Sequence, residues 1–230
     1  MNWKRLSAVA LVVGAAIGPW GPANAEMILS QVIVDLLPGK PPREDIEVWN
    51  DSEERMYVQA EPFEIRKPGT PDEQRVPAVD PEVSGILVSP QRLVLEPGER
   101  RIVRVAAVGA PSPNDRIYRV AIRPVAGPIS AESSALKVLV GYDALVLVRP
   151  LLTDSNLEVS RTAHTLVLHN AGTTAEELFD GQQCNPDGKD CQALPAKRLY
   201  AGATWAVELP FEGPVTYKTA IGPTIRQRQF

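Results

Sequence analysis

The chain carries two cysteines, Cys184 and Cys191, and two histidines, His164 and His169. The cysteines flank residues 185–190, whose Pro-Asp-Gly centre is a strong turn signal. A turn of this length brings the two cysteine Cα atoms within bridging reach. The spacing is not that of a C-x-x-C redox site, and a metal site would need further ligands. In an oxidising compartment we expect a Cys184–Cys191 disulfide that closes a hairpin.

Catalytic chemistry has little to work with in this sequence. His164 and His169 face opposite sides if they share a strand, which disfavours a Ser-His-Asp arrangement. There is no G-x-S-x-G motif, no Walker loop and no zinc spacing, and residues 187–190 lack the ligand alternation of a calcium loop. We expect no enzyme, no cofactor and no metal site, and an exported hydrolase is the least favoured class.

The N-terminus has the pattern of an export signal. Lys4 and Arg5 precede an apolar run over residues 6–17, and an A-x-A cleavage site ends at Ala25. The run is shorter than the roughly 20 residues that span a membrane. We therefore expect residues 1–25 to be a cleaved signal peptide, followed by an exported protein without membrane insertion.

The composition favours β structure. Proline takes 22 of 230 positions, about twice its ordinary usage, and proline breaks helix interiors. Short apolar segments separated by turn signals roughly every 8–12 residues predict all-β sandwiches. The net charge of −4 argues against a nucleic-acid partner, which needs a concentrated basic face.

The predicted strands form two groups, with Arg149-Pro150 as the domain boundary and no internal repeat of matching residues. The first group covers 28–37, 46–49, 56–66, 86–89, 92–95, 101–107, 118–125 and 136–148, and the second covers 157–159, 165–169, 173–179, 204–209 and 215–220. The acidic, proline-spaced residues 67–82 are expected to form a flexible loop.

The segment 136–148 is unusually long for a strand. One face begins with Leu136, Val138, Val140 and Tyr142 and stays apolar to its end. At ~3.3 Å per residue the segment spans roughly 43 Å, whereas strands usually have about 5–6 residues. Two interpretations stay open. The segment is either a buried central strand or a strand whose first half projects as an edge that pairs with a partner's sheet.

The sequence 89–105 contains the pattern P-x-x-x-x-L-x-P-G followed by a strand with Val103-Arg104. Together with Asn114-Asp115-Arg116 and Arg149-Pro150, it resembles the periplasmic pilus-assembly chaperones of the chaperone–usher pathway. The late disulfide hairpin and the short C-terminal half look most like the branch that serves the enterobacterial common pilus. The resemblance implies two immunoglobulin-like β-sandwich domains in a boomerang, over residues 26–149 and 150–230.

The resemblance also implies a mechanism. Such a chaperone binds pilus or fimbrial subunits in the periplasm by donor-strand complementation and delivers them to an outer-membrane usher. Leu136, Val138 and Val140 match the family's alternating donor positions, and Tyr142 extends their face. A self-capping dimer of the free chaperone is a further expectation. The alternative is an exported structural or adhesive fibre subunit.

The chain departs from the family at the residues that hold the subunit's C-terminal carboxylate. Many members use an arginine and a lysine, whereas this chain has Gln31 and Leu145 at the matching positions. The candidate substitutes are Arg116, Arg119, Arg123 and Arg149, because a guanidinium binds a carboxylate bidentately. For Arg149 the alternative is a structural ion pair at the domain junction.

Overall fold

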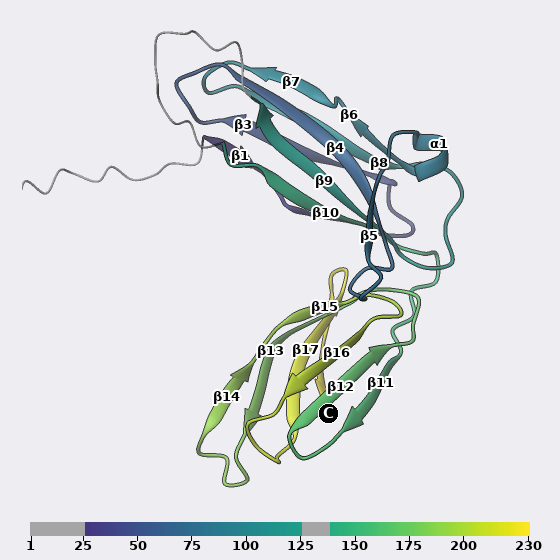
Figure 1. Cartoon of the computed structure of the whole chain (residues 1–230), viewed down its shortest axis with the longest axis vertical. Coiled ribbons are helices and arrows are strands. Elements are labelled where there is room, and N and C mark those ends of the chain that lie inside the picture. The colour runs from purple at the N-terminus through teal and green to yellow at the C-terminus, as the bar shows by residue number, and fades with distance from the viewer. Residues whose placement is uncertain (1–25, 126–138) are drawn as a thin grey trace, which may run out of the picture.

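The computed structural model describes residues 26–125 and 139–230, which form two β-sandwiches set end to end at an angle (Figure 1). This confirms the predicted all-β architecture of two sandwiches. No helix in the described part is long and apolar enough to cross a membrane. The predicted signal peptide, residues 1–25, lies outside the described residues.

The first sandwich consists of a four-stranded and a six-stranded sheet. The four-stranded sheet has the order β1 (Met27–Leu29), β3 (Arg43–Asn50), β8 (Arg100–Ala107), β6 (Ile86–Ser89). The six-stranded sheet has the order β2 (Ile33–Leu36), β10 (Tyr142–Val148), β9 (Arg116–Val125), β4 (Met56–Arg66), β5 (Gln74–Pro77), and β7 (Arg92–Leu95) also pairs with β4.

The second sandwich is smaller. Its three-stranded sheet has the order β11 (Leu157–Arg161), β12 (Thr165–Asn170), β16 (Thr204–Glu208). Its five-stranded sheet has the order β14 (Cys191–Leu194), β13 (Glu176–Cys184), β17 (Val215–Ile221), β18 (Thr224–Gln229), and β15 (Lys197–Leu199) also pairs with β13.

Alternation of side chains builds both cores. Along β4 and β12, buried residues alternate with partly exposed ones, as expected for strands that cover a core with one face. In the first sandwich the alternation buries Ile46, Val103 and Tyr118 together. In the second it buries Leu166, Leu178 and Tyr217.

Two predicted segments differ from the structure. The segment 28–37 is not one strand, because β1 pairs with β3 while β2 pairs with β10, so the chain crosses from one sheet to the other between them. The segment 67–82 is not a plain loop, because β5 pairs with β4 and a short helix, α1 (Pro81–Ser84), follows. Asp80 caps that helix by accepting a hydrogen bond from the Glu82 backbone N–H.

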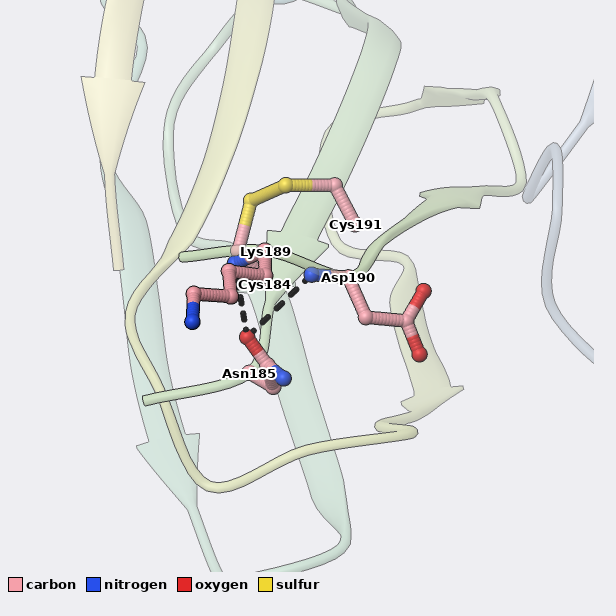
Figure 2. Close-up of a disulfide and its surroundings, with 5 residues drawn as sticks. All are labelled: Cys184, Asn185, Lys189, Asp190 and Cys191. Carbon is pink, nitrogen blue, oxygen red and sulfur yellow. Dashed lines mark hydrogen bonds between the residues drawn. A yellow bond between two sulfur atoms is a disulfide. The ribbon is translucent and has the colours of Figure 1, made fainter. Parts of the chain in front are cut away.

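The predicted hairpin at the far end of the second sandwich is present. Cys184 of β13 and Cys191 of β14 form a disulfide with a Cα–Cα distance of 3.9 Å (Figure 2). Within the turn, the Asn185 side-chain oxygen accepts hydrogen bonds from the backbone N–H groups of Lys189 and Asp190. The disulfide and this side chain together fix the hairpin tip.

Candidate functional site

One side of β10 is only partly covered by another strand. Strand β9 pairs with β10 along its whole length, whereas β2 pairs in parallel only from Leu145 to Val148. Within the described part of the chain, residues 142–144 therefore have no strand on the β2 side. An uncovered strand edge of this kind is a template for pairing with another chain.

The strand predicted over 136–148 begins at Tyr142 in the described residues. Leu139 and Val140 belong to no strand, and residues 136–138, with the predicted donor residues Leu136 and Val138, lie outside the described residues. The register explains the end of the pairing. Continuing it would place Val140 opposite Pro124, and proline has no N–H to donate to a ladder.

The two described donor candidates lie in different surroundings. The Val140 residue is 60% exposed. The Tyr142 side chain packs against the core of the first sandwich, and its hydroxyl donates to the Met27 carbonyl at 2.9 Å. Val140 is therefore accessible to a partner, while the Tyr142 ring is held within the first sandwich.

An apolar floor joins the two sandwiches beside β10. Leu145 and Leu147 project from β10 on the face opposite the sandwich core and pack with Ile117 of β9 and Ile65 of β4. Ala175, next to β13, belongs to the same cluster, with Tyr200 packed against it. The outer face of the six-stranded sheet and the second sandwich thus form the two walls of a cleft, which we call the β10 cleft.

Arg149 lies buried at the junction of the sandwiches. Its guanidinium, 3% exposed, donates to Asp35 at 2.7 and 3.0 Å and to Asp115 at 2.9 Å. It also donates to the Thr174 hydroxyl and the Ala175 carbonyl. These bonds engage it as a structural ion pair and leave it poorly placed to hold a partner's carboxylate.

Burial at this junction disfavours the charged forms of Arg149 and Asp115, and it therefore affects the pKa values of both groups. Burial opposes the charge on Arg149, but the hydrogen bonds and charges of Asp35 and Asp115 raise the Arg149 pKa above its ordinary value. Burial raises the pKa of Asp115, although Arg149 and the Ala175 N–H act in the opposite direction. The charges are tolerated because each has several partners.

Two further arginine candidates are paired with carboxylates of β4. Arg116 lies on the core-side face of β9, binds Glu64 at 2.7 Å and packs under the ring of Tyr118. Arg123 binds Glu61 at 2.5 Å. Neither lines the cavity that Arg119 borders.

Arg119 is the candidate that faces the β10 cleft. Its Cα lies opposite Leu145 in the β9–β10 register, and Leu145 is the position at which the sequence resemblance implies a lysine. It lines a cavity of about 290 Å³ with Ile65, Ile117 and Tyr200. Burial raises the pKa of the Tyr200 hydroxyl, and the nearby Arg119 charge partly offsets that rise. Arg119 thus provides a cation at the apolar floor.

The cavity also contains residues that sequence reasoning missed. Arg75 of β5 lines it and binds the Asp143 carboxylate with both terminal nitrogens, at 2.8 and 3.0 Å. Arg75 was overlooked because it falls in the segment predicted to be a flexible loop. Tyr200 was overlooked because nothing in the sequence indicates that the second sandwich reaches this wall.

The two anchor positions of the resemblance carry no charge in the cleft. The Gln31 side chain donates to the Asp45 carbonyl at 3.1 Å, and Leu145 is buried in the apolar floor. The described residues also contain no group of three or more His, Cys, Asp or Glu side chains placed to hold a metal ion.

Comparison with known proteins places this geometry in a known fold. No protein-family model matches the chain. The crystal structure of the class 5 fimbriae chaperone CfaA matches with a TM-score of 0.65 and 21% identity, covering 88% of this chain and 98% of that one. The chain has the fold of the pilus-assembly chaperones.

Other solved structures with this chaperone fold agree. A Salmonella enterica complex of SafA pilin with the SafB chaperone matches with a TM-score of 0.64 and 18% identity, covering 91% of this chain and 98% of that one. The E. coli chaperone DraB matches with a TM-score of 0.62 and 19% identity, covering 89% and 95%. These matches cover both sandwiches, as the predicted two-sandwich architecture requires.

A curated relative from Escherichia coli is similar in sequence as well. Its name describes a fimbrial subunit of CFA/I, and it is 27% identical in an alignment of 177 residues that covers 73% of this chain and 72% of the relative. The name thus refers to a component of the fimbria, whereas the solved structures with the same fold are chaperones. The predicted likeness to the branch of the enterobacterial common pilus stays a prediction.

Proposed function

We propose that the protein is a non-enzymatic periplasmic chaperone that holds pilus subunits by lending them a strand. The observation that carries the proposal is the uncovered side of β10 at residues 142–144, in a chain with the chaperone fold. A subunit with an open groove has unpaired backbone groups, which are costly to bury without partners. A lent strand supplies those hydrogen bonds.

The side chains of the lent strand provide the apolar part of the contact. We propose Leu136, Val138 and Val140 for this role, of which the structure describes Val140 as 60% exposed. Each apolar side chain buried in a groove contributes roughly 1.5–3 kcal/mol before the cost of ordering the chains. Tyr142 is a less suitable donor because its ring already packs in the first sandwich.

We propose Arg119 as the residue that holds the subunit's C-terminal carboxylate. The position of Arg119 opposite Leu145 and its place in the cleft cavity support this role. Arg116 and Arg123 are paired with glutamates of β4, and Arg149 is engaged by two buried or partly buried aspartates. An arginine suits a carboxylate because its donors form a planar fork.

The rest of the cycle follows from the same role. Residues 1–25 direct export to the periplasm and are removed, residues 26–149 form the domain that binds the subunit, and residues 150–230 form the second domain. An outer-membrane usher receives the loaded chaperone. In the free chaperone the uncovered β10 edge pairs with a second copy of the chain.

The test is co-expression with a small fibre subunit encoded beside this chain's gene, followed by purification from the periplasm. We expect a one-to-one complex with the wild-type chaperone and at least tenfold less complex with Val140→Asp, because a carboxylate cannot enter an apolar pocket unpaired. Val159→Asp is the matched control, since Val159 is an exposed valine of the second sandwich. An undiminished complex with Val140→Asp excludes strand donation by this segment.

The name of the curated relative favours a second candidate, a fibre subunit. Such a component polymerises with copies of itself at an usher, whereas a chaperone stays soluble and binds one subunit per chaperone. Electron microscopy of cells that express the chain with its neighbouring genes separates the two. Detection of this chain along surface fibres overturns the chaperone proposal.

A further inference from the structure

We infer that Arg75 and Arg119 form a carboxylate-binding site that Asp143 occupies in the unbound protein and that a carboxylate of the partner takes over on binding. The inference rests on the proposed function for the nature of the partner, a polypeptide that lies along β10. The new element is an internal competitor: the Asp143 carboxylate, which belongs to β10 itself, competes with the partner's carboxylate for the two arginines.

Arg75 already binds a carboxylate in the geometry typical of carboxylate recognition. Its two terminal nitrogens donate to the two Asp143 oxygens at 2.8 and 3.0 Å, which is the planar fork arrangement of guanidinium and carboxylate. The guanidinium lies over the Phe63 ring, 4.2 Å from its centre. From β5, at the far end of the sheet order, the side chain therefore reaches across β4 and β9 to β10.

Arg119 contributes a second guanidinium that is not committed to a carboxylate in the same way. One of its nitrogens donates to the Asp143 backbone carbonyl at 3.2 Å. Its Nε lies 3.9 Å from the Asp143 carboxylate, which is too long for a hydrogen bond. Arg119 therefore keeps donor capacity within reach of a second acceptor.

The surroundings fit a carboxylate that carries an apolar neighbour. The cavity of about 290 Å³ has Ile65, Pro68 and Ile117 in its wall beside the two arginines. Tyr200 lines the same space from the second sandwich, and a side chain at Gly69 of the β4–β5 turn would press against its ring. A peptide that places its carboxylate at the arginines can therefore bury a neighbouring apolar side chain.

The Asp143 carboxylate can be displaced from the two arginines by another carboxylate. The Asp143 side chain is 45% exposed and that of Arg75 is 41% exposed, and an ion pair in contact with solvent is weak enough to open and re-form. Asp143 also lies in the uncovered part of β10, residues 142–144. A strand that adds to this edge lies next to the Asp143 carboxylate. A carboxylate on that strand can therefore compete with Asp143 for Arg75 and Arg119.

The internal carboxylate therefore sets a threshold for binding. While Asp143 is bound, the arginine pair is partly neutralised and held in place. A ligand whose competent site is open only a fraction of the time binds with its affinity reduced by that fraction. If Asp143 occupies the pair for about nine-tenths of the time, its removal strengthens carboxylate binding about tenfold.

The test measures peptide binding to the full mature chain by fluorescence polarisation. The probes are a labelled apolar hexapeptide with a free C-terminal carboxylate, its C-terminal amide, and the amide with one internal glutamate. We expect Asp143→Asn to bind the free-carboxylate peptide about tenfold more tightly than wild type and the plain amide equally. The glutamate arm tells a terminal carboxylate from an acidic side chain as the natural source.

Matched variants separate competition from a general change in charge. Glu73→Gln removes an acid from the same cavity, where Glu73 contacts the Gly69 N–H rather than an arginine, and we expect less than a twofold effect. Arg119→Met should abolish the advantage of the free carboxylate. Unchanged or weaker binding to Asp143→Asn, an equal gain with Glu73→Gln, or no binding of any probe overturns the inference. The subunit co-purification with Val140→Asp tests the proposed function independently.

Discussion

Asn50 and Asn170 occupy equivalent places in the two sandwiches. Asn50 ends β3 and its side-chain nitrogen donates to the carbonyls of Glu54 and Leu95, at 2.7 and 3.1 Å. Asn170 ends β12 and donates to the carbonyls of Thr174 and Leu199, both at 2.9 Å. Each residue is fully buried, and each ties a turn to a strand far away in sequence.

The backbone around the two asparagines matches as well. The Asn50 carbonyl accepts from Gly98 and the Asn170 carbonyl accepts from Gly202, and both glycines have a positive φ, of 74° and 79°. The two sandwiches therefore share a structural repeat. No repeat is apparent in the sequence, because a few residues at different spacings carry it.

The sandwiches differ where function is proposed. The first leaves part of β10 uncovered, while the second carries the Cys184–Cys191 disulfide. Equivalent buried asparagines thus support two different sandwiches. One has an uncovered strand edge, and the other has a disulfide-bonded hairpin. We expect stabilising features to act separately in the two units, except at their junction.

The largest expected effect is at that junction. Arg149→Met leaves the carboxylates of Asp35 and Asp115 without their guanidinium, and we expect a loss of about 3–5 kcal/mol in the free energy of unfolding. Urea unfolding followed by tryptophan fluorescence should then show the sandwiches unfolding in two steps. Arg104→Met, which removes an exposed pair with Asp45, is the control and should cost at most about 1 kcal/mol. Equal losses in the two variants contradict the structural role of Arg149.

The asparagines test the equivalence directly. Asn50→Ala and Asn170→Ala each remove two hydrogen bonds that a fully buried side chain donates, and we expect each to cost about 2–4 kcal/mol. Asn114→Ala, at an exposed loop residue, should change stability by no more than about 0.5 kcal/mol. Denaturant titration of the three variants gives the comparison. A large effect at only one buried asparagine disproves the equivalence.

The disulfide should affect only the second sandwich. The double variant Cys184→Ser/Cys191→Ser opens a short loop, and the loop-entropy estimate gives a loss of about 2–3 kcal/mol. Hydrogen exchange should show faster opening of β13 and β14 and no change in β3 and β8. Faster exchange in the first sandwich would show that the two units are not independent.

The smallest expected effect is on stability at alkaline pH. Burial raises the pKa of Tyr217 from 10.0 to about 12, so the folded protein keeps a proton that the unfolded chain loses. The contribution of the Tyr217 proton to the free energy of unfolding is therefore fully present below pH 10. This contribution, roughly 1–2 kcal/mol, is lost as the pH rises from about 10 to about 12. Tyr217→Phe should lose less stability over this interval in denaturant titrations. Tyr118→Phe should behave alike, because burial also raises the Tyr118 pKa. A wild-type pH profile in both variants contradicts the expectation.

The sequence predicted the architecture because its signals are local. Strand β4 has the predicted bounds of 56–66, and β6 and β7 match theirs, since each is rich in apolar residues and lies between turn residues. The hairpin turn and its disulfide were also readable from one segment. Strand β18 was missed because its residues, 224–229, are mostly polar and do not alternate with apolar ones.

The candidate site could not be predicted to the same extent. Its cleft brings together side chains from β5, β9, β10 and the second sandwich, and no local pattern indicates such distant contacts. Arg119 was one of four arginines with equal sequence support. The register that puts it opposite Leu145, and the pairing of Arg116 with Glu64, distinguish them only in the folded chain.

The buried Arg149 has a mechanical consequence for β10. One end of this strand is fixed, because Arg149 follows Val148 directly and binds the first sandwich at Asp35 and the second at Ala175. The other end leaves the sheet at Tyr142. Strand β10, which β9 pairs along its whole length, thus connects the exposed Val140 to the fixed joint between the two sandwiches.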